Sequence, residues 1–343
     1  MAWLDENSKK RLVIVGALTT LVQCHARGPI VDVPKTTEVG RKTSMAVAPS
    51  KEGPSAPPEA PAEPEDDKET TPGEPAPKPS IELPRGGREL FPTHRLVGFC
   101  GTPGAPALGR LEGKLPVKVK RLEAQAEKYR GRKLLPVLEL IAVVVQGAPG
   151  KDGKWRRRVP YSVVDEYLQA ARGAKALLLL NIQPGHSDFL TEAKHFEKYL
   201  KMPEVGLALD PEWAMSGKQK PGVSFGQTTG TMINRVAEYL SEIVKDNDLP
   251  EKALVFHQVN SHVVKDEAAL AAYPGVALIK GVDGLGPKGA KIKTYNFLVK
   301  GMAPFVHAGF KLFFDEDTAN GGKLMTPEEV LALSPEPEYV MYE

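Results

Sequence analysis

From about residue 90 to its end, the chain alternates short apolar runs with amphipathic stretches. The apolar runs are continuous rather than alternating, which is typical of strands that are buried on both faces of a parallel sheet. Eight runs have the length of such strands, and they occupy 95–101, 134–145, 174–183, 205–213, 252–259, 275–284, 309–317 and 338–343.

The stretches between these runs carry apolar residues at helical spacing. Leu190, Ala193, Phe196 and Leu200 fall on one stripe, and 233–243 repeats the pattern. Other segments that we expect to be helical, including one with a proline in its first turn, are 115–129, 161–171, 264–272, 292–299 and 327–333.

Strands that alternate with helices over roughly 250 residues predict an α/β fold of the closed (β/α)8 barrel type. An open, doubly wound sheet has the same alternation of elements. However, the sequence GFCGTPGAPALG after the first strand lacks the GxGxxG spacing of a dinucleotide-binding sheet. The pattern therefore favours the barrel.

The segment 1–24 has the features of an export signal. A basic cluster at 9–11 precedes LVIVGALTTLVQ, which is too short to cross a bilayer because a spanning helix needs roughly 20 apolar residues. The segment ends in LVQC and resembles a bacterial lipoprotein signal, which implies that Cys24 is lipidated and anchors the protein to a membrane of the cell envelope. Gln23 departs from that pattern, and a plain secretory signal or a short uncleaved anchor are the alternatives.

The segment 25–88 contains a long stretch rich in Pro, Glu and Ala, with almost no large apolar residues. Such a composition cannot bury enough surface to offset the entropy of ordering, so we expect a disordered linker. The predicted organisation is a signal at 1–24, this linker, and a barrel domain at 89–343.

Charge and cysteine content exclude some classes of protein. Lys and Arg number 45 against 43 Asp and Glu, so the net charge of +2 gives no reason to expect nucleic acid as a partner. The basic run WRRR at 155–158 is expected to be a solvated loop. With only two cysteines, the chain has no disulfide framework.

Polar residues gather where the predicted strands end. In a barrel of this type the active site lies at the C-terminal ends of the strands. Positions i and i+2 share a face of a strand, so Asp210 and Glu212 point the same way. The candidate site residues are Glu139, Asn181, Gln183, Asp210, Glu212, Trp213, His257, Gln258, Asp283 and Asp315.

Two carboxyl groups on one face suit the hydrolysis of a glycosidic bond, in which one carboxyl donates a proton and another stabilises the cationic centre. Glu212 is the expected proton donor, because burial and a like charge raise the pKa of a carboxyl. Asp210 assists it, and Asp315 or Asp283 supplies the opposite charge. Trp213 offers a flat face to a sugar ring, or it packs beneath the barrel rim.

The other candidates have structural alternatives. Asn181, Gln183, His257 and Gln258 would donate hydrogen bonds to sugar hydroxyls, although His257 has the alternative of a core histidine with satisfied nitrogens. Asp283 precedes a glycine and suits a turn. Glu139 sits inside an apolar run and needs a partner, since a buried carboxylate is costly alone.

Cys100 ends the first predicted strand, where it is either a nucleophile or an inert core residue. No histidine stands beside it in the sequence to activate a thiolate.

The stretch LALDPE resembles the strand-end D-x-E of barrel glycoside hydrolases, including the lysozyme-like family 25 and the chitinases. Where family 25 has an aspartate at the end of the first strand, this chain has Cys100. The stretches VGFCGTPG, NIQPGHSDFL, LALDPEW and GFKLFFDED also resemble a family of bacterial lipoproteins of uncharacterised activity, which implies export and a barrel.

These features predict an exported, glycoside hydrolase-like barrel that acts on cell-envelope or environmental glycans without a cofactor or metal. A non-catalytic barrel that binds glycan or serves as a cell-wall scaffold is the first alternative. The second is a metal-dependent, phosphodiesterase-like barrel using Glu139, Asp210, His257 and Asp283, although neither HxH nor HExxH occurs in the chain.

Overall fold

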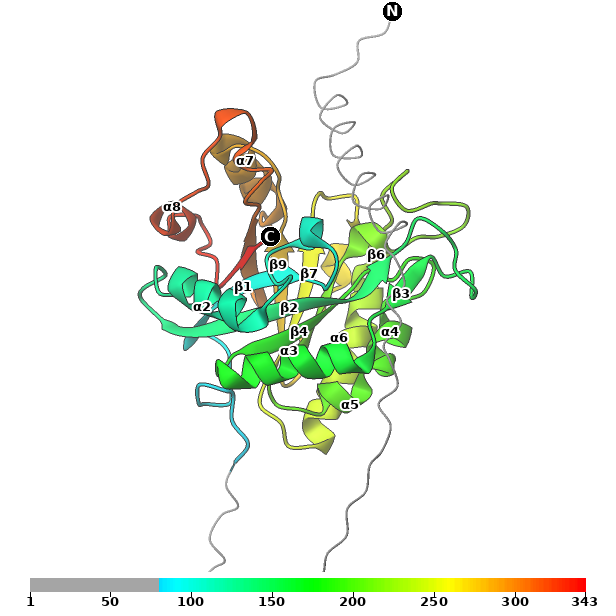
Figure 1. Ribbon diagram of the computed structural model, residues 1–343, viewed down its shortest axis with the longest axis horizontal. Helices are drawn as coiled ribbons and strands as arrows, with labels where there is room; N and C mark the ends of the chain where they lie inside the picture. The colour runs from blue at the N-terminus through cyan, green and yellow to red at the C-terminus, as the bar shows by residue number, and fades with distance from the viewer. Residues whose placement is uncertain (1–79) are drawn as a thin grey trace, which may run out of the picture. The chain divides into compact units, whose positions relative to one another are not determined.

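The computed structural model describes residues 80–343, except the side chain of Asn320, and shows a closed ring of parallel strands with helices outside it (Figure 1). Each strand of the ring pairs with the next, and the last pairs with the first. The predicted (β/α)8 barrel is confirmed. Its strands are β1 (His94–Gly101), β2 (Lys133–Val145), β4 (Leu177–Ile182), β5 (Val205–Leu209), β7 (Lys252–Gln258), β9 (Val276–Val282), β10 (Val306–Leu312) and β11 (Tyr339–Tyr342).

All eight predicted strands therefore exist, and the ring carries one addition. The short strand β3 (Arg156–Arg158) pairs antiparallel with the end of β2, so the connection after β2 doubles back as a hairpin at the C-terminal rim of the barrel.

The helices bury their predicted apolar stripes against the outside of the strands. The predicted segment that includes Leu190 is divided at Phe196 into two short helices. The α-helices of the described residues are α2 (Leu115–Ala126), α3 (Tyr161–Gly173), α4 (Phe189–His195), α5 (Glu197–Leu200), α6 (Gly230–Asp246), α7 (Lys288–Leu298) and α8 (Pro327–Leu331).

The helix predicted at 264–272 is wrong. The connection between β7 and β9 instead contains β8 (Val264–Lys265), which pairs with β6 (Thr228–Thr229), and the 3-10 turn η3 (Glu267–Ala269). Asp266 stands between β8 and η3 with a φ of 52°. This left-handed conformation interrupts the regular backbone that an α-helix requires.

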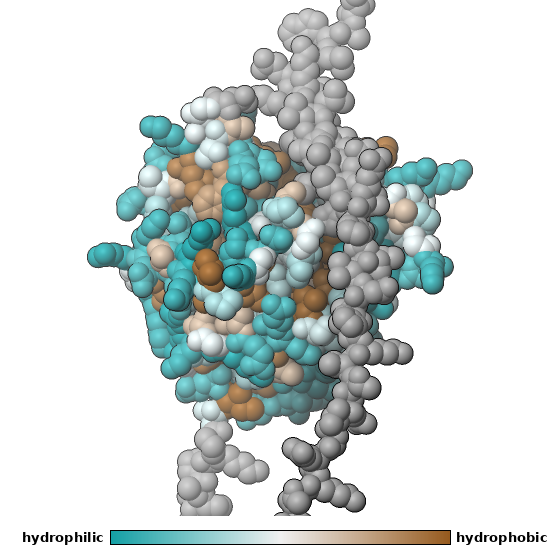
Figure 2. All heavy atoms as spheres, viewed as in Figure 1, coloured by the Kyte–Doolittle hydropathy of each residue, from teal (hydrophilic) through white to brown (hydrophobic). Residues whose placement is uncertain are grey.

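The inside of the barrel is apolar toward the N-terminal ends of the strands. Its layers come from alternate strand positions, as the two-residue period of a strand requires. The inward apolar side chains include Leu96, Leu135, Val137, Leu177, Leu179, Ala208, Ala253, Val255, Ala277 and Ile279. The surface visible in Figure 2 is mostly hydrophilic, with several separate apolar patches.

The folded part begins at about Ile81 rather than at residue 89, because the end of the predicted linker packs under the barrel. Leu83 is 3% exposed and joins the apolar core inside the strands. The Arg85 guanidinium donates to the backbone carbonyls of Leu134, Ala174 and Lys175 at 3.1, 3.2 and 3.1 Å. These bonds tie the segment to the C-terminal end of α3.

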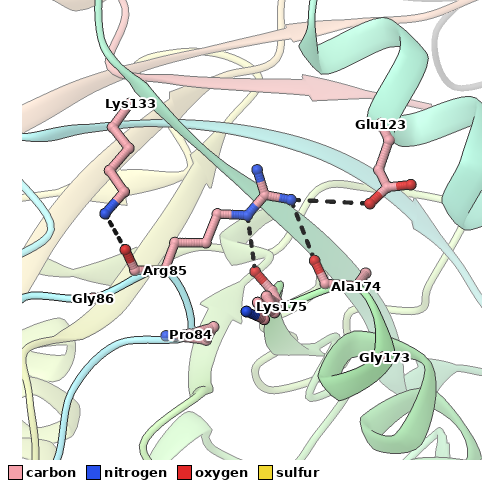
Figure 3. A pocket seen from close by; sticks show the side chains of 8 residues that line it. All are labelled: Pro84, Arg85, Gly86, Glu123, Lys133, Gly173, Ala174 and Lys175. Carbon is pink, nitrogen blue, oxygen red and sulfur yellow. Dashed lines mark hydrogen bonds and ion pairs between the residues drawn. The ribbon is translucent and has the colours of Figure 1, made fainter.

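A pocket of about 620 Å³ surrounds Arg85 at the starts of the strands (Figure 3). Its polar groups are largely engaged with one another, since Lys133 donates to the Arg85 carbonyl and Glu123 lies 3.9 Å from the guanidinium. The pocket therefore belongs to the attachment of residues 81–88 and lies at the opposite end of the barrel from the strand C-termini.

The predicted signal at 1–24 with Cys24, and the linker as far as residue 79, lie outside the described residues. Between residues 80 and 343, no helix combines the length and apolarity that crossing a bilayer would require.

Candidate functional site

The C-terminal ends of the barrel strands enclose a buried group of polar side chains, which we call the polar cluster. The inward rows that are apolar lower in the barrel continue here with charged or amide residues. Every strand of the ring contributes to it directly or through the residue that follows. Its members are Cys100, Glu139, Asn181, Gln183, Asp210, Glu212, His257, Asp283, Lys311, Tyr339 and Glu343.

His257 lies at the centre of the polar cluster, between two carboxylates. Its Nδ1 is 2.9 Å from Asp283 Oδ1, and its Nε2 is 3.1 Å from Glu139 Oε1. Burial disfavours the imidazolium, but the charges of Asp283 and Glu139 outweigh burial and raise the pKa of His257 well above the ordinary value. The side chain is therefore an imidazolium that donates from both nitrogens.

The inward face of β9 makes room for this histidine. A Cβ on Gly281 would lie 2.9 Å from His257 Nδ1, which is closer than a carbon atom can approach without a shift. The glycine is thus a steric requirement of the ion pair between His257 and Asp283.

Glu139 has the partners that its burial demands. Besides His257, it accepts hydrogen bonds from Asn181 Nδ2 and from the Tyr339 hydroxyl, each at 2.9 Å. Burial opposes ionisation of this carboxyl, but His257, Lys311 and Asn181 together lower the pKa of Glu139 below its ordinary value. Glu139 is a fixed anion at the floor of the polar cluster.

Lys311 supplies the second positive charge. Its Nζ lies 3.2 Å from Asp283 Oδ2 and 2.6 Å from Glu343 Oε2. Burial disfavours the charged form of Lys311, but these two carboxylates outweigh burial and raise the pKa of Lys311 well above the ordinary value. Burial likewise disfavours the ionised form of Asp283, but His257 and Lys311 lower the pKa of Asp283 below its ordinary value. Asp283 is therefore held between two cations and is more than a turn residue.

Asp210 is positioned by two amide side chains from the neighbouring strand. Asn181 Nδ2 donates to Asp210 Oδ1 at 2.9 Å, and Gln183 Nε2 donates to Asp210 Oδ2 at 3.0 Å. Gln183 is held in turn, because its oxygen accepts from the amide of Val145 at 3.1 Å. Both oxygens of Asp210 are thus fixed in direction.

Glu212 differs from the other carboxyls of the polar cluster because, among the described residues, no other side chain forms an ion pair or a hydrogen bond with it. It lies in the 3-10 turn η2 (Pro211–Trp213) and is 6% exposed. Its Oε2 is buried without a hydrogen-bond partner among the described residues. The structure therefore leaves one buried carboxyl oxygen with an unused capacity for a hydrogen bond.

The proton of the Asp210–Glu212 pair resides on Glu212. Burial, followed by the charges of Asp210 and Asp283, raises the pKa of Glu212 well above the ordinary value. Burial also raises the pKa of Asp210, but the donors Asn181 and Gln183 stabilise its ionised form. The result is a neutral carboxylic acid beside a carboxylate, which is an arrangement suited to proton donation.

Three of the predicted site residues lie outside the polar cluster. Asp315 has an 85% exposed side chain and pairs with Arg110 on the surface at 2.9 Å. Gln258 points outward from β7, where its Nε2 lies 3.4 Å from Glu267. Trp213 is 6% exposed and packs with Val145 and Met215 beneath the rim, so it presents no free face.

Cys100 is a buried member of the polar cluster with weak contacts. Its Sγ lies 3.7 Å from the Leu108 carbonyl and 3.4 Å from Glu343 Oε2. Burial, followed by the charge of Glu343, raises the pKa of the thiol well above the ordinary value. The thiol is therefore protonated and unsuited to nucleophilic attack.

The sequence did not identify Lys311, Tyr339 and Glu343, although each has a recognisable position. Lys311 is an inward residue within the apolar run GFKLFF, two positions after Gly309. Tyr339 and Glu343 occupy the same inward row of the last strand segment. Extending the two-residue period along β10 and β11 would have found all three.

Metal ligation is not favoured by the positions of these side chains. Within residues 80–343, no group of three or more His, Cys, Asp or Glu side chains has an arrangement that could hold a metal ion. Both nitrogens of His257 are engaged with carboxylates.

Comparisons with known proteins give no family. No family model matches the chain, and no curated protein matches it. Among solved structures, HPPK-DHPS from Plasmodium falciparum, determined with pteroate, is similar with a TM-score of 0.31 and 10% sequence identity. The alignment covers 73% of this chain and 45% of that one, so the chain spans less than half the length of that structure.

Proposed function

We propose that the protein is a glycoside hydrolase-like barrel in which Glu212 is the general acid and Asp210 assists it. The observation that carries this proposal is the buried Glu212 carboxyl, with a raised pKa and an unpaired Oε2 beside the oriented Asp210 carboxylate. The resemblance of LALDPE to the strand-end D-x-E of barrel glycosidases supports the same assignment.

In the proposed reaction, Glu212 transfers its proton to the glycosidic oxygen as the bond from that oxygen to the anomeric carbon breaks. The electron pair of the broken bond remains on the leaving oxygen. Asp210 stabilises the positive charge that develops on the sugar ring. Water then adds its hydroxyl to the anomeric carbon and returns a proton to Glu212.

His257 and Lys311 are positioning residues in this scheme. Their charges hold Glu139 and Asp283 ionised, and Glu139 orients Asn181, which in turn orients Asp210. Because Asp210 and Glu212 are each 6% exposed, the proposal requires neighbouring chain to move before a substrate reaches them. We propose that the segment 214–227 makes this movement, since it is tied to the backbone of the acid by the bond from the Gly226 amide to the Glu212 carbonyl at 2.6 Å.

The direct test is the release of reducing ends from a panel of polysaccharides, including peptidoglycan, by the purified protein. We expect Glu212→Gln to lower the rate by about 10²–10⁴-fold and Asp210→Asn to lower it as well. Asp315→Asn is the control, since this exposed carboxylate lies outside the polar cluster. Equal rates for the wild type and Glu212→Gln would refute the proposal.

A non-catalytic, glycan-binding barrel is the second candidate, and the burial of the polar cluster favours it. Its carboxylates other than Asp210 and Glu212 are each paired internally with His257 or Lys311. In that case the panel would give no product, and Glu212→Gln would retain glycan as well as the wild type does. A metal-dependent phosphodiesterase is less well supported, because His257 has no free nitrogen.

The proposed substrate fits an exported protein held in the cell envelope by a lipid on Cys24. This expectation concerns residues outside 80–343 and is tested separately. Labelled palmitate should be incorporated into the wild type and not into Cys24→Ala. Incorporation into both would show that Cys24 is not the lipidated residue.

A further inference from the structure

A second pocket lies at the C-terminal rim of the barrel, on the side of β2 and β5. Its volume is about 470 Å³. It is formed by the hairpin loop before β3 and by the loops after β4 and β5, and we call it the Trp155 pocket. Its lining includes Asp152, Lys154, Trp155, His186, Lys218 and Lys220.

The loops around the Trp155 pocket are bound to one another. The His186 amide donates to the Lys154 carbonyl at 2.8 Å, and His186 Nε2 lies 2.8 Å from the Gln219 carbonyl. A Cβ on Gly185 would lie 2.3 Å from the Lys154 carbonyl oxygen, so these backbones approach too closely for any other residue. The pocket is a built feature of the fold.

Trp155 is held in an unusual conformation at the wall of this pocket. Its φ is 55°, a left-handed value that is a genuine outlier for a bulky side chain. The next residues anchor it, because Arg156 Nε and Arg158 Nε pair with the fully buried Glu192 at 2.9 and 2.6 Å. The expectation that the run WRRR is a solvated loop is therefore wrong, because Arg156 and Arg158 are fixed by ion pairs to Glu192 and hold Trp155 in place.

The charge of the Trp155 pocket is positive. Lys218 and Lys220 form no ion pair with any described residue, whereas Asp152 is engaged by Arg156 Nη1 at 2.6 Å. Lys154 donates to the His186 carbonyl at 3.2 Å. Two half-buried rings, Trp155 and His186, lie beside these ammonium groups with their centroids 6.1 Å apart.

We propose that the Trp155 pocket binds an anionic sugar residue of the substrate. An aromatic wall suits the apolar face of a sugar ring, and unpaired ammonium groups suit a carboxylate on that ring. The inference rests on the proposed function and narrows its substrate class to acidic polysaccharides.

The pocket is joined to Glu212 through one segment of chain. The segment 214–227 carries Lys218 and Lys220 on the pocket side and reaches the Glu212 carbonyl through Gly226. Gln219 Nε2 donates to the Phe225 carbonyl at 3.0 Å, which links the two parts of the segment. A sugar bound at the pocket therefore contacts the same segment that is hydrogen-bonded to the backbone of the acid.

The test measures the binding of tetragalacturonate and of the uncharged cellotetraose by Trp fluorescence and calorimetry, in the Glu212→Gln protein so that no turnover occurs. We expect tetragalacturonate to bind about tenfold more tightly at low salt, with an advantage that falls as salt rises. Equal affinities for the two tetrasaccharides would overturn the inference.

Two variants locate the binding. Trp155→Gly should lower the affinity for tetragalacturonate by about tenfold. The variant should keep the fold, because glycine accepts a φ of 55° without strain. The double variant K218A/K220A should abolish the preference for the acidic sugar. The control K300A/K323A removes the same charge from exposed lysines elsewhere and should bind as before. Unchanged affinity of Trp155→Gly for tetragalacturonate would refute the proposal that the Trp155 pocket binds the sugar.

The outcomes separate this inference from the proposed function. If the wild type hydrolyses glycans through Glu212 while the pocket variants bind normally, the inference fails and the function stands. If the pocket binds tetragalacturonate but the wild type releases no product, the function fails and the pocket belongs to a binding barrel.

Discussion

Replacing His257, the central histidine of the polar cluster, tests how much the ion pairs of the cluster stabilise the fold, and the test requires no knowledge of the substrate. In His257→Gln, Glu139 and Asp283 each lose a charged donor, at 3.1 and 2.9 Å, in a site where His257 is 0% exposed. Breaking a buried ion pair by removing one partner costs about 3–5 kcal/mol. Two hydrogen bonds to charged groups, at about 1.5–3 kcal/mol each, give a similar sum.

The assay is urea and thermal unfolding followed by circular dichroism. At about 2–4 °C per kcal/mol for a domain of this size, His257→Gln should lower the melting temperature on the order of 10 °C. His262→Gln is the matched control, since His262 is an exposed histidine and should change stability by less than about 0.5 kcal/mol.

The pH dependence supplies a second criterion. Because the folded-state pKa of His257 is raised, its stabilisation is complete below about pH 6.5 and is lost as pH rises through the folded pKa. Glu139 and Asp283 have lowered pKa values, so their share is lost only as pH falls below their ordinary range of about 4. The free energy of unfolding of the wild type should therefore exceed that of His257→Gln by the largest amount between about pH 4.5 and 6.5. A difference below about 1 kcal/mol throughout that window would refute the reasoning.

Three further predictions follow from single groups. As pH rises above about 4.3, the free energy of unfolding of Glu212→Gln should increase relative to that of the wild type, because the raised pKa of Glu212 makes the wild type lose stability there. A difference in the free energy of urea unfolding that does not change with pH would contradict this. Gly281→Ala should destabilise by about 1–3 kcal/mol, because its Cβ would meet His257 Nδ1 at 2.9 Å, whereas Gly289→Ala in α7 has open space and should not destabilise. Iodoacetamide should label Cys100 only after unfolding, as peptide mapping would show, and rapid labelling of the native protein would disprove the burial of the protonated thiol.

The barrel could be predicted from the sequence because its strands are buried on both faces. Continuous apolar runs such as 177–180 have few other interpretations when amphipathic stretches separate them. The helix at 264–272 failed for a local reason, since the left-handed Asp266 leaves no trace in apolar periodicity. The packing of Leu83 under the barrel was also hidden, because isolated apolar residues in a proline-rich stretch give no periodic signal.

The site could be predicted only in part, because strand ends reveal which residues meet but not where each side chain points. Glu139, Asp210 and His257 converge as their inward positions require. Gln258 follows His257 directly and so faces outward, and Asp315 lies beyond the end of β10 and points to solvent. The two-residue period of β7 would have placed Gln258 outward, whereas loop conformation, which depends on contacts between distant segments, decides the position of Asp315.

The most direct measurement of the central claim is the protonation state of Glu212 at neutral pH. Infrared difference spectroscopy of the wild type against Glu212→Gln isolates the carbonyl stretch of this one carboxyl. We predict the band of a protonated carboxylic acid at pH 7 in the wild type, absent from the variant. A carboxylate band at pH 7, unchanged down to the ordinary pKa of a glutamate, would contradict the assignment of Glu212 as a buried acid.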